Sequence, residues 1–338
     1  MSGNKIEKRD ASFDVIRIIA CFLVVIYHSR YQLYEIGGGI STLDRLCLNA
    51  SFLIGRLAVP IFFIMSGYFT FPIKGTTFSF LFKRFERIIP PFIVWVAIYA
   101  IILSSPSTYL HDIAYLDKAP QMWYLYALMG VTLLIPVLSS YFSYASRKEY
   151  LLYLGIWVVT LIFNGNYFDF FNTIETNHQG LLFTNPISCL LNFYGYAGYI
   201  VLGAYLKKYG VSVKESFLCI AVAVVYLVIS IRSLQVEIAN AMGYCTIINA
   251  LFSLAAIVLI RNIVGRMNIS ENTSKYVSNI GKLTFGVYLN HWLIFQLLYK
   301  INYFNTANCI ITSIVVFLLS LLVTWLLSLI PKSKYIIG

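Results

Sequence analysis

Apolar segments recur along the whole chain, and their length limits the possible folds more than any other feature. They run to about 17 to 25 residues, which matches a ~30 Å hydrocarbon layer at a rise of ~1.5 Å per residue. Backbone groups in lipid must be paired within the segment, so helices are favoured. The sequence therefore predicts an all-α polytopic bundle of about ten transmembrane helices. The spans are expected near residues 12–33, 50–71, 88–104, 121–141, 150–166, 186–206, 215–232, 242–260, 283–300 and 308–330.

The distribution of charge orients this bundle. Only 12% of the residues are charged and 59% are hydrophobic, far from the composition of a soluble domain. The net charge of +11 at first suggests a nucleic-acid partner, but the Lys and Arg residues follow the loops. By our assignment 18 lie in loops on the side of the N-terminus and 5 on the opposite side. This asymmetry predicts that both termini are cytoplasmic and argues against nucleic acid.

No change in composition, long linker or low-complexity tract divides the chain. Residues 1–338 are therefore expected to form a single integral-membrane domain, with no soluble extracytoplasmic domain. The six cysteines are scattered without CxxC spacing, so neither a metal site nor a disulfide framework is predicted.

Two ionisable residues in the first span are functional candidates, because burying such groups in a membrane costs at least ~2.5 kcal/mol. Arg17 and His28 are eleven residues apart, which corresponds to three helical turns plus ~20° and ~16.5 Å of rise. Both side chains are thus expected on one face, Arg17 near the cytoplasmic end and His28 near the outer end. The alternative is structural: Arg17 pairs with Asp14, and His28 is an interfacial residue.

The second span contains Arg56 and Pro60. Proline cannot donate to the carbonyl four residues earlier, which belongs to Arg56, so a kink and an unpaired carbonyl are predicted there. A kinked, charged helix is typical of a cavity wall. Ser66 and Gly67 follow, and their alternative role is a small-residue packing face.

Three basic residues, Lys83, Arg84 and Arg87, precede Pro90 and Pro91. We expect the prolines to mark a helix start, whose free N–H groups and dipole favour anions. The cluster is a candidate phosphate clamp. The alternative is an ordinary cytoplasmic anchor.

Aromatic and polar residues in two later spans are further candidates. Trp123 and Tyr124 open the fourth span on the outer side, where an interfacial aromatic belt is the alternative reading. His291 lies about midway along the ninth span, next to Asn290. A polar pair at that depth is expected to face the interior of the bundle.

In order and spacing, these segments resemble acyltransferase family 3, which includes membrane O-acetyltransferases of bacterial surface polysaccharides. The resemblance covers most of the chain. Its most specific element is an Arg followed after ten residues by a His in the first span, Arg17 and His28. The other matching segments are Arg56 to Tyr68, Lys83-Arg84-x-x-Arg87, Trp123-Tyr124-Leu125 and Phe285-Gly286-x-Tyr288-Leu289-x-His291.

The resemblance implies an O-acyltransferase that uses cytoplasmic acetyl-CoA and no metal, in the bacterial cytoplasmic (inner) membrane. The acceptor would be a hydroxyl of a surface polysaccharide or of its lipid-linked precursor, and membrane lipid would surround the protein. Many relatives carry an additional extracytoplasmic domain, for which the loops here are too short. Transfer is therefore expected in the membrane domain itself or on a separate partner.

Site roles follow from this resemblance. His28 would be the catalytic base or the carrier of the acyl group, and Arg17 its partner along the same helix face. Lys83, Arg84 and Arg87 would bind the phosphates of the donor. The remaining candidates would line the substrate pocket: Arg56, Ser66, Trp123, Tyr124, Asn290 and His291.

Two other functions stay open at the level of sequence. A transporter or flippase for a glycan or small anion would also use buried charge and a proline-broken helix, although no symmetric pair of broken helices is evident. A structural subunit of a glycan-assembly machine would explain polar outer loops, but it would not need Arg17 and His28 on a shared face.

Overall fold

The computed structural model describes residues 10–35, 42–116, 118–162, 195–232, 241–301 and 309–338. In this part of the chain the secondary structure is helical and contains no strand. The all-α prediction is therefore confirmed. The longer helices are α1 (Ala11–Glu35), α2 (Thr42–Gly55), α3 (Ala58–Thr70), α4 (Thr77–Leu103), α6 (Trp123–Tyr144), α7 (Arg147–Ile162), α8 (Ala197–Tyr209), α9 (Val213–Arg232), α11 (Ile247–Arg266), α12 (Glu271–Lys300) and α13 (Cys309–Ser328). The short ones are α5 (Tyr109–Tyr115), the 3-10 turn η1 (Pro120–Met122) and α14 (Lys334–Ile337).

Seven stretches of the described residues are long and apolar enough to cross a membrane. The chain is therefore a multi-pass membrane protein, although the expected count of about ten is not confirmed. The three predicted spans without a counterpart lie near 150–166, 186–206 and 283–300. The first two run into residues outside the described part, whereas the third lies in α12, whose first half is polar and whose second half is largely buried by other helices. The seven stretches are Ala11–Ser29, Asn49–Thr70, Thr77–Leu103, Tyr109–Tyr144, Val213–Arg232, Ile247–Arg266 and Ile310–Ser328.

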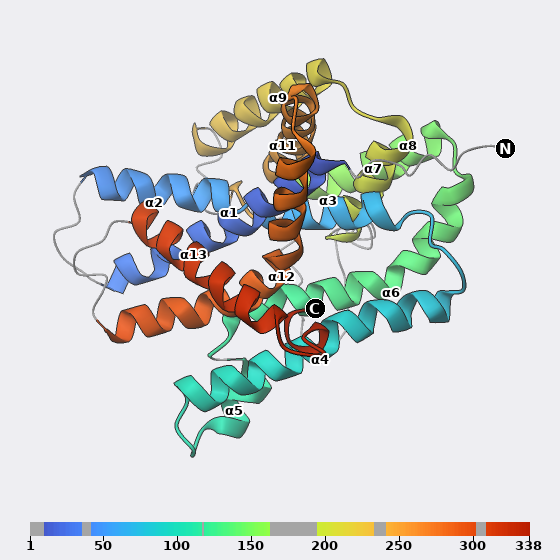
Figure 1. Ribbon diagram of the computed structural model, residues 1–338. Coiled ribbons are helices and arrows are strands. Elements are labelled where there is room, and N and C mark those ends of the chain that lie inside the picture. The colour runs from blue at the N-terminus through green and yellow to red at the C-terminus, as the bar shows by residue number, and fades with distance from the viewer. Residues whose placement is uncertain (1–9, 36–41, 117, 163–194, 233–240, 302–308) are drawn as a thin grey trace, which may run out of the picture.

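Helix α1 lies at the centre of the bundle. It packs against α2, α3, α11, α12 and α13. In Figure 1, α4 and α6 run along one side of this group and α9 along the other. The helix that carries Arg17 and His28 is thus surrounded largely by protein, which is where a membrane protein can hold ionisable groups.

Glycines bring α3 and α8 into backbone contact. A Cβ atom on Gly67 would overlap the carbonyl of Ile200, and one on Gly203 would overlap the carbonyl of Ile64. Small residues permit this close approach in membranes, where no hydrophobic force drives helices together. The packing role considered for Gly67 is therefore confirmed.

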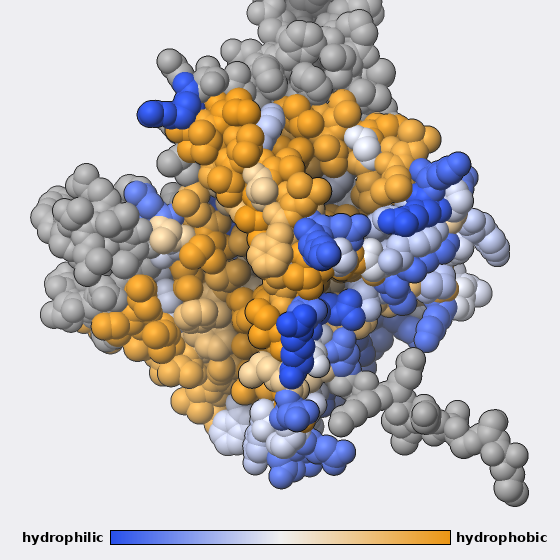
Figure 2. All heavy atoms as spheres, turned by 90° about the horizontal axis from the view of Figure 1, so that it is seen from above, coloured by the Kyte–Doolittle hydropathy of each residue, from blue (hydrophilic) through white to orange (hydrophobic). Residues whose placement is uncertain are grey.

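The surface separates an apolar region from a charged one. Figure 2 shows hydrophobic residues over much of one face, with hydrophilic residues gathered toward one side. Large apolar side chains on α4, α6, α9 and α13 are exposed, including Ile101, Val137, Val225 and Leu318. Such a surface is unstable in water and matches a lipid environment.

Candidate functional site

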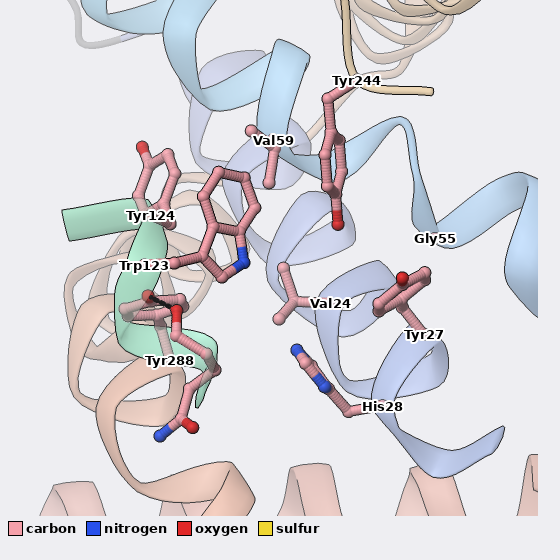
Figure 3. Close-up of a pocket in the computed structure, with 10 residues that line it drawn as sticks. Val24, Tyr27, His28, Gly55, Val59, Trp123, Tyr124, Tyr244 and Tyr288 are labelled. Atoms are coloured by element: carbon pink, nitrogen blue, oxygen red, sulfur yellow. Dashed lines mark hydrogen bonds between the residues drawn. The ribbon is translucent and has the colours of Figure 1, made fainter. Parts of the chain in front are cut away.

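A pocket lies between the C-terminal half of α1 and four other parts of the fold. The space among its lining atoms is about 300 Å³, including the part open to solvent. Its walls come from α1, the α2–α3 junction, the start of α6 with η1, the turn before α11, and α12 (Figure 3). The lining residues are Val24, Tyr27, His28, Gly55, Val59, Gln121, Trp123, Tyr124, Tyr244 and Tyr288.

His28 forms one wall of this pocket. In Figure 3 its ring projects from α1 toward the side where Trp123 lies. Tyr27 and Trp292 contact the imidazole at ring-centre distances of 5.3 and 5.4 Å, both edge-on. The structure thus places His28, which is partly buried, against an aromatic pocket.

His291 packs behind His28 rather than lining the pocket. The centres of the two imidazoles are 5.1 Å apart. His291 has no exposed surface, and its Nδ1 lies 2.7 Å from the carbonyl oxygen of Tyr288 and 3.2 Å from that of Val287. Its Nε2 has no hydrogen-bond partner in the described part of the chain. Sequence reasoning placed His291 near the site but did not predict this pairing of rings.

Tyr99, on α4, forms hydrogen bonds with the turn of α12 that carries His291. The hydroxyl of Tyr99 donates to the carbonyl oxygen of Leu289 at 2.8 Å and accepts from the N–H of Leu293 at 3.0 Å. These two backbone groups would pair with each other in a regular helix. Tyr99 therefore bridges one helical turn that contains His291.

The helix is interrupted between α2 and α3, as Pro60 predicts. The side-chain amide of Asn249 donates to the carbonyl oxygen of Arg56 at 3.0 Å, and Ser253 lies 3.5 Å from that of Leu57. The expected orphan carbonyl thus has a partner, supplied by α11. This part of the sequence prediction is confirmed.

The guanidinium of Arg56 sits in an aromatic cage beside the pocket. It lies 4.7 Å from the ring centre of Phe52, 4.8 Å from that of Tyr244 and 5.5 Å from that of Tyr27. Among the described residues no carboxylate forms an ion pair with it. Cation–π contacts therefore hold Arg56 without neutralising its charge.

Trp123 and Tyr124 line the pocket and do not merely belong to an interfacial belt. Trp123 packs on Tyr244 at 5.1 Å, and Tyr124 packs edge-on against Tyr288 at 5.6 Å. Helix α12 also contacts the turn that precedes α6: the hydroxyl of Tyr288, on α12, donates to the carbonyl of Gln121 at 2.5 Å. In Figure 3 the Trp123 and Tyr124 rings stand on the opposite side of the pocket from His28.

Arg17 lies away from the pocket. It forms an ion pair of 3.0 Å with Asp14, whose side chain is 3% exposed, while that of Arg17 is 31% exposed. The pairing offered by the structural alternative is therefore present. Near it, Arg261 lies 3.5 Å from Asp10 and stacks over the ring of Phe13.

The prediction of a helix start after the basic cluster was wrong. Helix α4 begins at Thr77, capped by Thr76, and continues through Pro90 and Pro91. The cluster therefore lies inside a helix, and free N–H groups do not contribute to anion binding there. Its side chains still point outward in part: Lys83 and Arg87 are exposed, and Arg84 donates to Thr70 at 2.6 Å.

Two further candidates do not line the pocket. Asn290 donates to the hydroxyl of Thr324 at 2.9 Å and to the carbonyl of Ser320 at 3.3 Å, so its amide faces α13. Ser66 lies on α3 beside the glycine contact with α8. The structure thus gives Asn290 a place in helix packing.

Two tyrosines of the pocket, Tyr27 and Tyr244, carried no distinctive signal in the sequence. They are two of 26 tyrosines, and only the packing of distant helices distinguishes them. Gln121 did carry a signal, since a glutamine two residues before a tryptophan at a span end is unusual in lipid. Its side chain is buried, and neither amide atom has a hydrogen-bond partner in the described part of the chain.

Comparison with known proteins gives the family. The family model described as an acyltransferase domain (Acyl_transf_3) matches residues 10–330, nearly the whole chain. Neither the curated proteins nor the solved structures contain a significant match. The match covers every element that forms the pocket, and the resemblance seen in the sequence is thereby confirmed. This multi-pass membrane protein belongs to acyltransferase family 3.

Proposed function

We propose that this membrane acyltransferase transfers an acetyl group from cytoplasmic acetyl-CoA to a hydroxyl of a surface glycan or of its lipid-linked precursor. One observation carries the proposal. On the central helix, His28 forms a wall of an aromatic pocket, whereas cationic side chains gather at the other end of the same helix. This arrangement suits an anionic donor that enters from one side and an acceptor that arrives from the other.

The cationic end supports the choice of donor. The ends of α1, α3 and α11 meet the start of α4 there, through the contacts of Arg261 with Asp10 and Tyr68 and of Arg84 with Thr70. Lys207 joins them by donating to the carbonyl of Phe71 at 2.7 Å. We assign this surface to the phosphates of CoA, with Lys83, Arg84 and Arg87 as contacts.

The distance along α1 also fits this donor. Arg17 and His28 are separated by ~16.5 Å of helical rise. An extended pantetheine arm spans a similar length, so the thioester would reach His28 while the nucleotide remained at the cationic end. The arm would pass between α4 and the pocket, because α4 packs against α6, which carries Tyr124.

The chemistry needs one base and one positioned carbonyl. His28 accepts the proton of the acceptor hydroxyl while the hydroxyl oxygen attacks the thioester carbonyl. The C–S bond then breaks, and the departing sulfur takes the proton from His28 to leave as free CoA. In the covalent route the imidazole attacks the thioester carbonyl first and expels CoA, whose sulfur takes up the ring proton. The acceptor hydroxyl then displaces the imidazole from the acyl group and returns a proton to the ring. Arg56 would orient an acceptor in either route.

The aromatic walls support a sugar acceptor. The tryptophan and the tyrosines present flat faces with polar edges, a combination that holds a ring bearing hydroxyl groups.

The test uses detergent-purified wild type and His28→Ala with radiolabelled acetyl-CoA. Wild type should release free CoA, slowly without acceptor and faster with it, and His28→Ala should release none while eluting as wild type does. Label on wild-type protein would select the covalent route. Release by His28→Ala at the wild-type rate would contradict the assignment. Movement of a glycan across the membrane without CoA release would favour the transporter.

A further inference from the structure

The cation beside the pocket is not neutralised by the protein. Arg56 lies in the apolar stretch Asn49–Thr70, and charged residues within such a span normally pair with an opposite charge. In the described part of the chain its guanidinium forms no ion pair, and its buried Nε has no hydrogen-bond partner. Burying a charged donor without an acceptor is costly. The fold therefore keeps a positive charge here that the described protein groups leave unneutralised.

Backbone contacts hold Arg56 in this position. A Cβ atom on Gly55 would lie 2.6 Å from that of Tyr27, so only glycine lets the end of α2 approach α1 this closely. The side-chain amide of Asn249 then donates to the carbonyl oxygen of Arg56 at 3.0 Å. Irregular backbone in a membrane protein is tolerated where it lines a cavity. Because Gly55 lines the pocket, the residue that follows it is fixed at the edge of the pocket.

The aromatic cage leaves the Arg56 guanidinium able to bind an anion. The centres of the Phe52, Tyr244 and Tyr27 rings lie 4.7, 4.8 and 5.5 Å from it. Tyr27 and Tyr244 also line the pocket at which His28 lies (Figure 3). Cation–π contacts leave the planar fork of N–H groups able to donate. An arginine that only reached for lipid headgroups would extend its charged end into water, whereas the Nε of this one is buried.

We propose that the acceptor carries an oxyanion and that Arg56 binds it, an inference that rests on the proposed function. A guanidinium donates two parallel hydrogen bonds to a carboxylate or a phosphate, which fixes the orientation of the ligand as well as balancing its charge. Such a contact beside the pocket holds the acceptor while one of its hydroxyl groups lies at His28. The substrate class is therefore an anionic glycan. Its oxyanion is either the carboxylate of a sugar acid or the phosphate that joins the glycan to its lipid carrier.

The place of Arg56 in the fold favours the acceptor over the donor. Tyr27, which contacts its guanidinium, precedes His28 in the C-terminal half of α1. The cationic surface assigned to CoA lies at the other end of that helix, where Arg261 contacts Asp10. A nucleotide held there does not bring its phosphates to the opposite end of α1. The charge of Arg56 is thus left for a second substrate.

The charge of the product tests this inference directly. Membrane vesicles containing wild type are incubated with radiolabelled acetyl-CoA, and the labelled glycan is applied to an anion exchanger. The label should be retained. Mild acid, which cleaves lipid-linked sugar phosphates, should release it if the oxyanion is the phosphate of the carrier, and esterification of carboxyl groups should release it if the oxyanion is a sugar acid. Label that never binds the exchanger, or that stays bound after both treatments, would overturn the inference.

Variants of Arg56 test whether this residue recognises the oxyanion. Glutamine keeps a donor but removes the charge, so Arg56→Gln should lower the labelling of glycan about 100-fold while eluting from detergent as wild type does. Arg56→Lys restores the charge without the planar fork and should recover about tenfold of this loss. Arg232→Gln, at an exposed arginine that ends α9, is the matched control and should label as wild type does.

The outcomes separate this inference from the proposed function. If wild type neither labels glycan nor releases CoA, the proposed function fails. If wild type labels glycan but Arg56→Gln labels it equally, or Arg56→Lys recovers nothing, Arg56 does not bind an oxyanion of the acceptor.

Discussion

At the scale of single residues, the site depends on polar atoms that are satisfied by partners far away in the sequence. Asn249 is fully buried, and its side-chain amide lies within 3.0 to 3.4 Å of the carbonyl oxygens of Arg56, Met242 and Gly243. It therefore joins the break between α2 and α3 to the turn that carries Tyr244. This side chain thus helps to hold Arg56 and Tyr244 beside the pocket, together with the hydrogen bond from Tyr199 to the carbonyl of Tyr244.

Replacing Asn249 should lower the free energy of unfolding by more than the loss of its few side-chain atoms suggests. Asn249→Ala leaves buried carbonyls without donors, at a cost of about 1 to 3 kcal/mol. The midpoint of thermal unfolding in detergent should fall by several degrees. Asn268→Ala, at an exposed position, should leave it unchanged. An equal midpoint for Asn249→Ala and wild type would show that the α2–α3 break is held by other contacts.

At the scale of helices, two local interruptions shape the pocket. One is the break between α2 and α3, and the other is the turn of α12 that Tyr99 bridges. Pro60 allowed the first to be predicted, because a missing N–H is visible in the sequence. The second was not predictable, since it depends on a tyrosine 190 residues before Leu289, with nothing to distinguish it from the other 25.

The bridge by Tyr99 can be tested without removing its ring. Tyr99→Phe loses two hydrogen bonds at about 1 kcal/mol each and loosens the turn that holds His291. Amide hydrogen exchange at residues 289–293 should become faster, and kcat should fall. Tyr115→Phe, on an exposed side chain, is the control. Unchanged exchange at these amides would mean that α12 closes its own hydrogen bond there.

The glycine contact between α3 and α8 can be tested with a single substitution. Gly67→Ala places a methyl group on the backbone of Ile200, which cannot move aside as a side chain can. The variant should lose its monodisperse elution or its thermal transition. Gly130→Ala on α6, where the added atom meets nothing, should behave as wild type. A stable Gly67→Ala protein would show that the two helices can separate at little cost.

At the scale of the whole molecule, the sequence indicated the class of fold, the family and much of the pocket. Segment length and the spacing of Arg17 and His28 were sufficient for this. It placed the basic cluster wrongly relative to its helix, because Pro90 and Pro91 resemble a helix start although the helix continues through them. The expected span at 283–300 is not among the seven apolar stretches, because polar residues such as Asn290, His291 and Gln296 lower the hydropathy of α12.

The separation of charge across the molecule predicts which variants affect the donor. Arg84→Ala and Arg87→Ala should each raise KM for acetyl-CoA, by up to tenfold or ~1.4 kcal/mol. The effect should weaken at high salt, because exposed charges are screened. Lys300→Ala, at the end of α12, should leave KM unchanged. If all three variants have the KM of wild type for acetyl-CoA, the phosphate site does not lie on α4.

The central claim is that His28, at one pocket, is required for the transfer of an acyl group from CoA to a glycan. The most direct measurement is the label that radiolabelled acetyl-CoA leaves in the glycan fraction of membrane vesicles containing wild type, His28→Ala or His111→Ala. The account predicts label with wild type and His111→Ala and none with His28→Ala, at equal protein levels. Equal label in all three would contradict it.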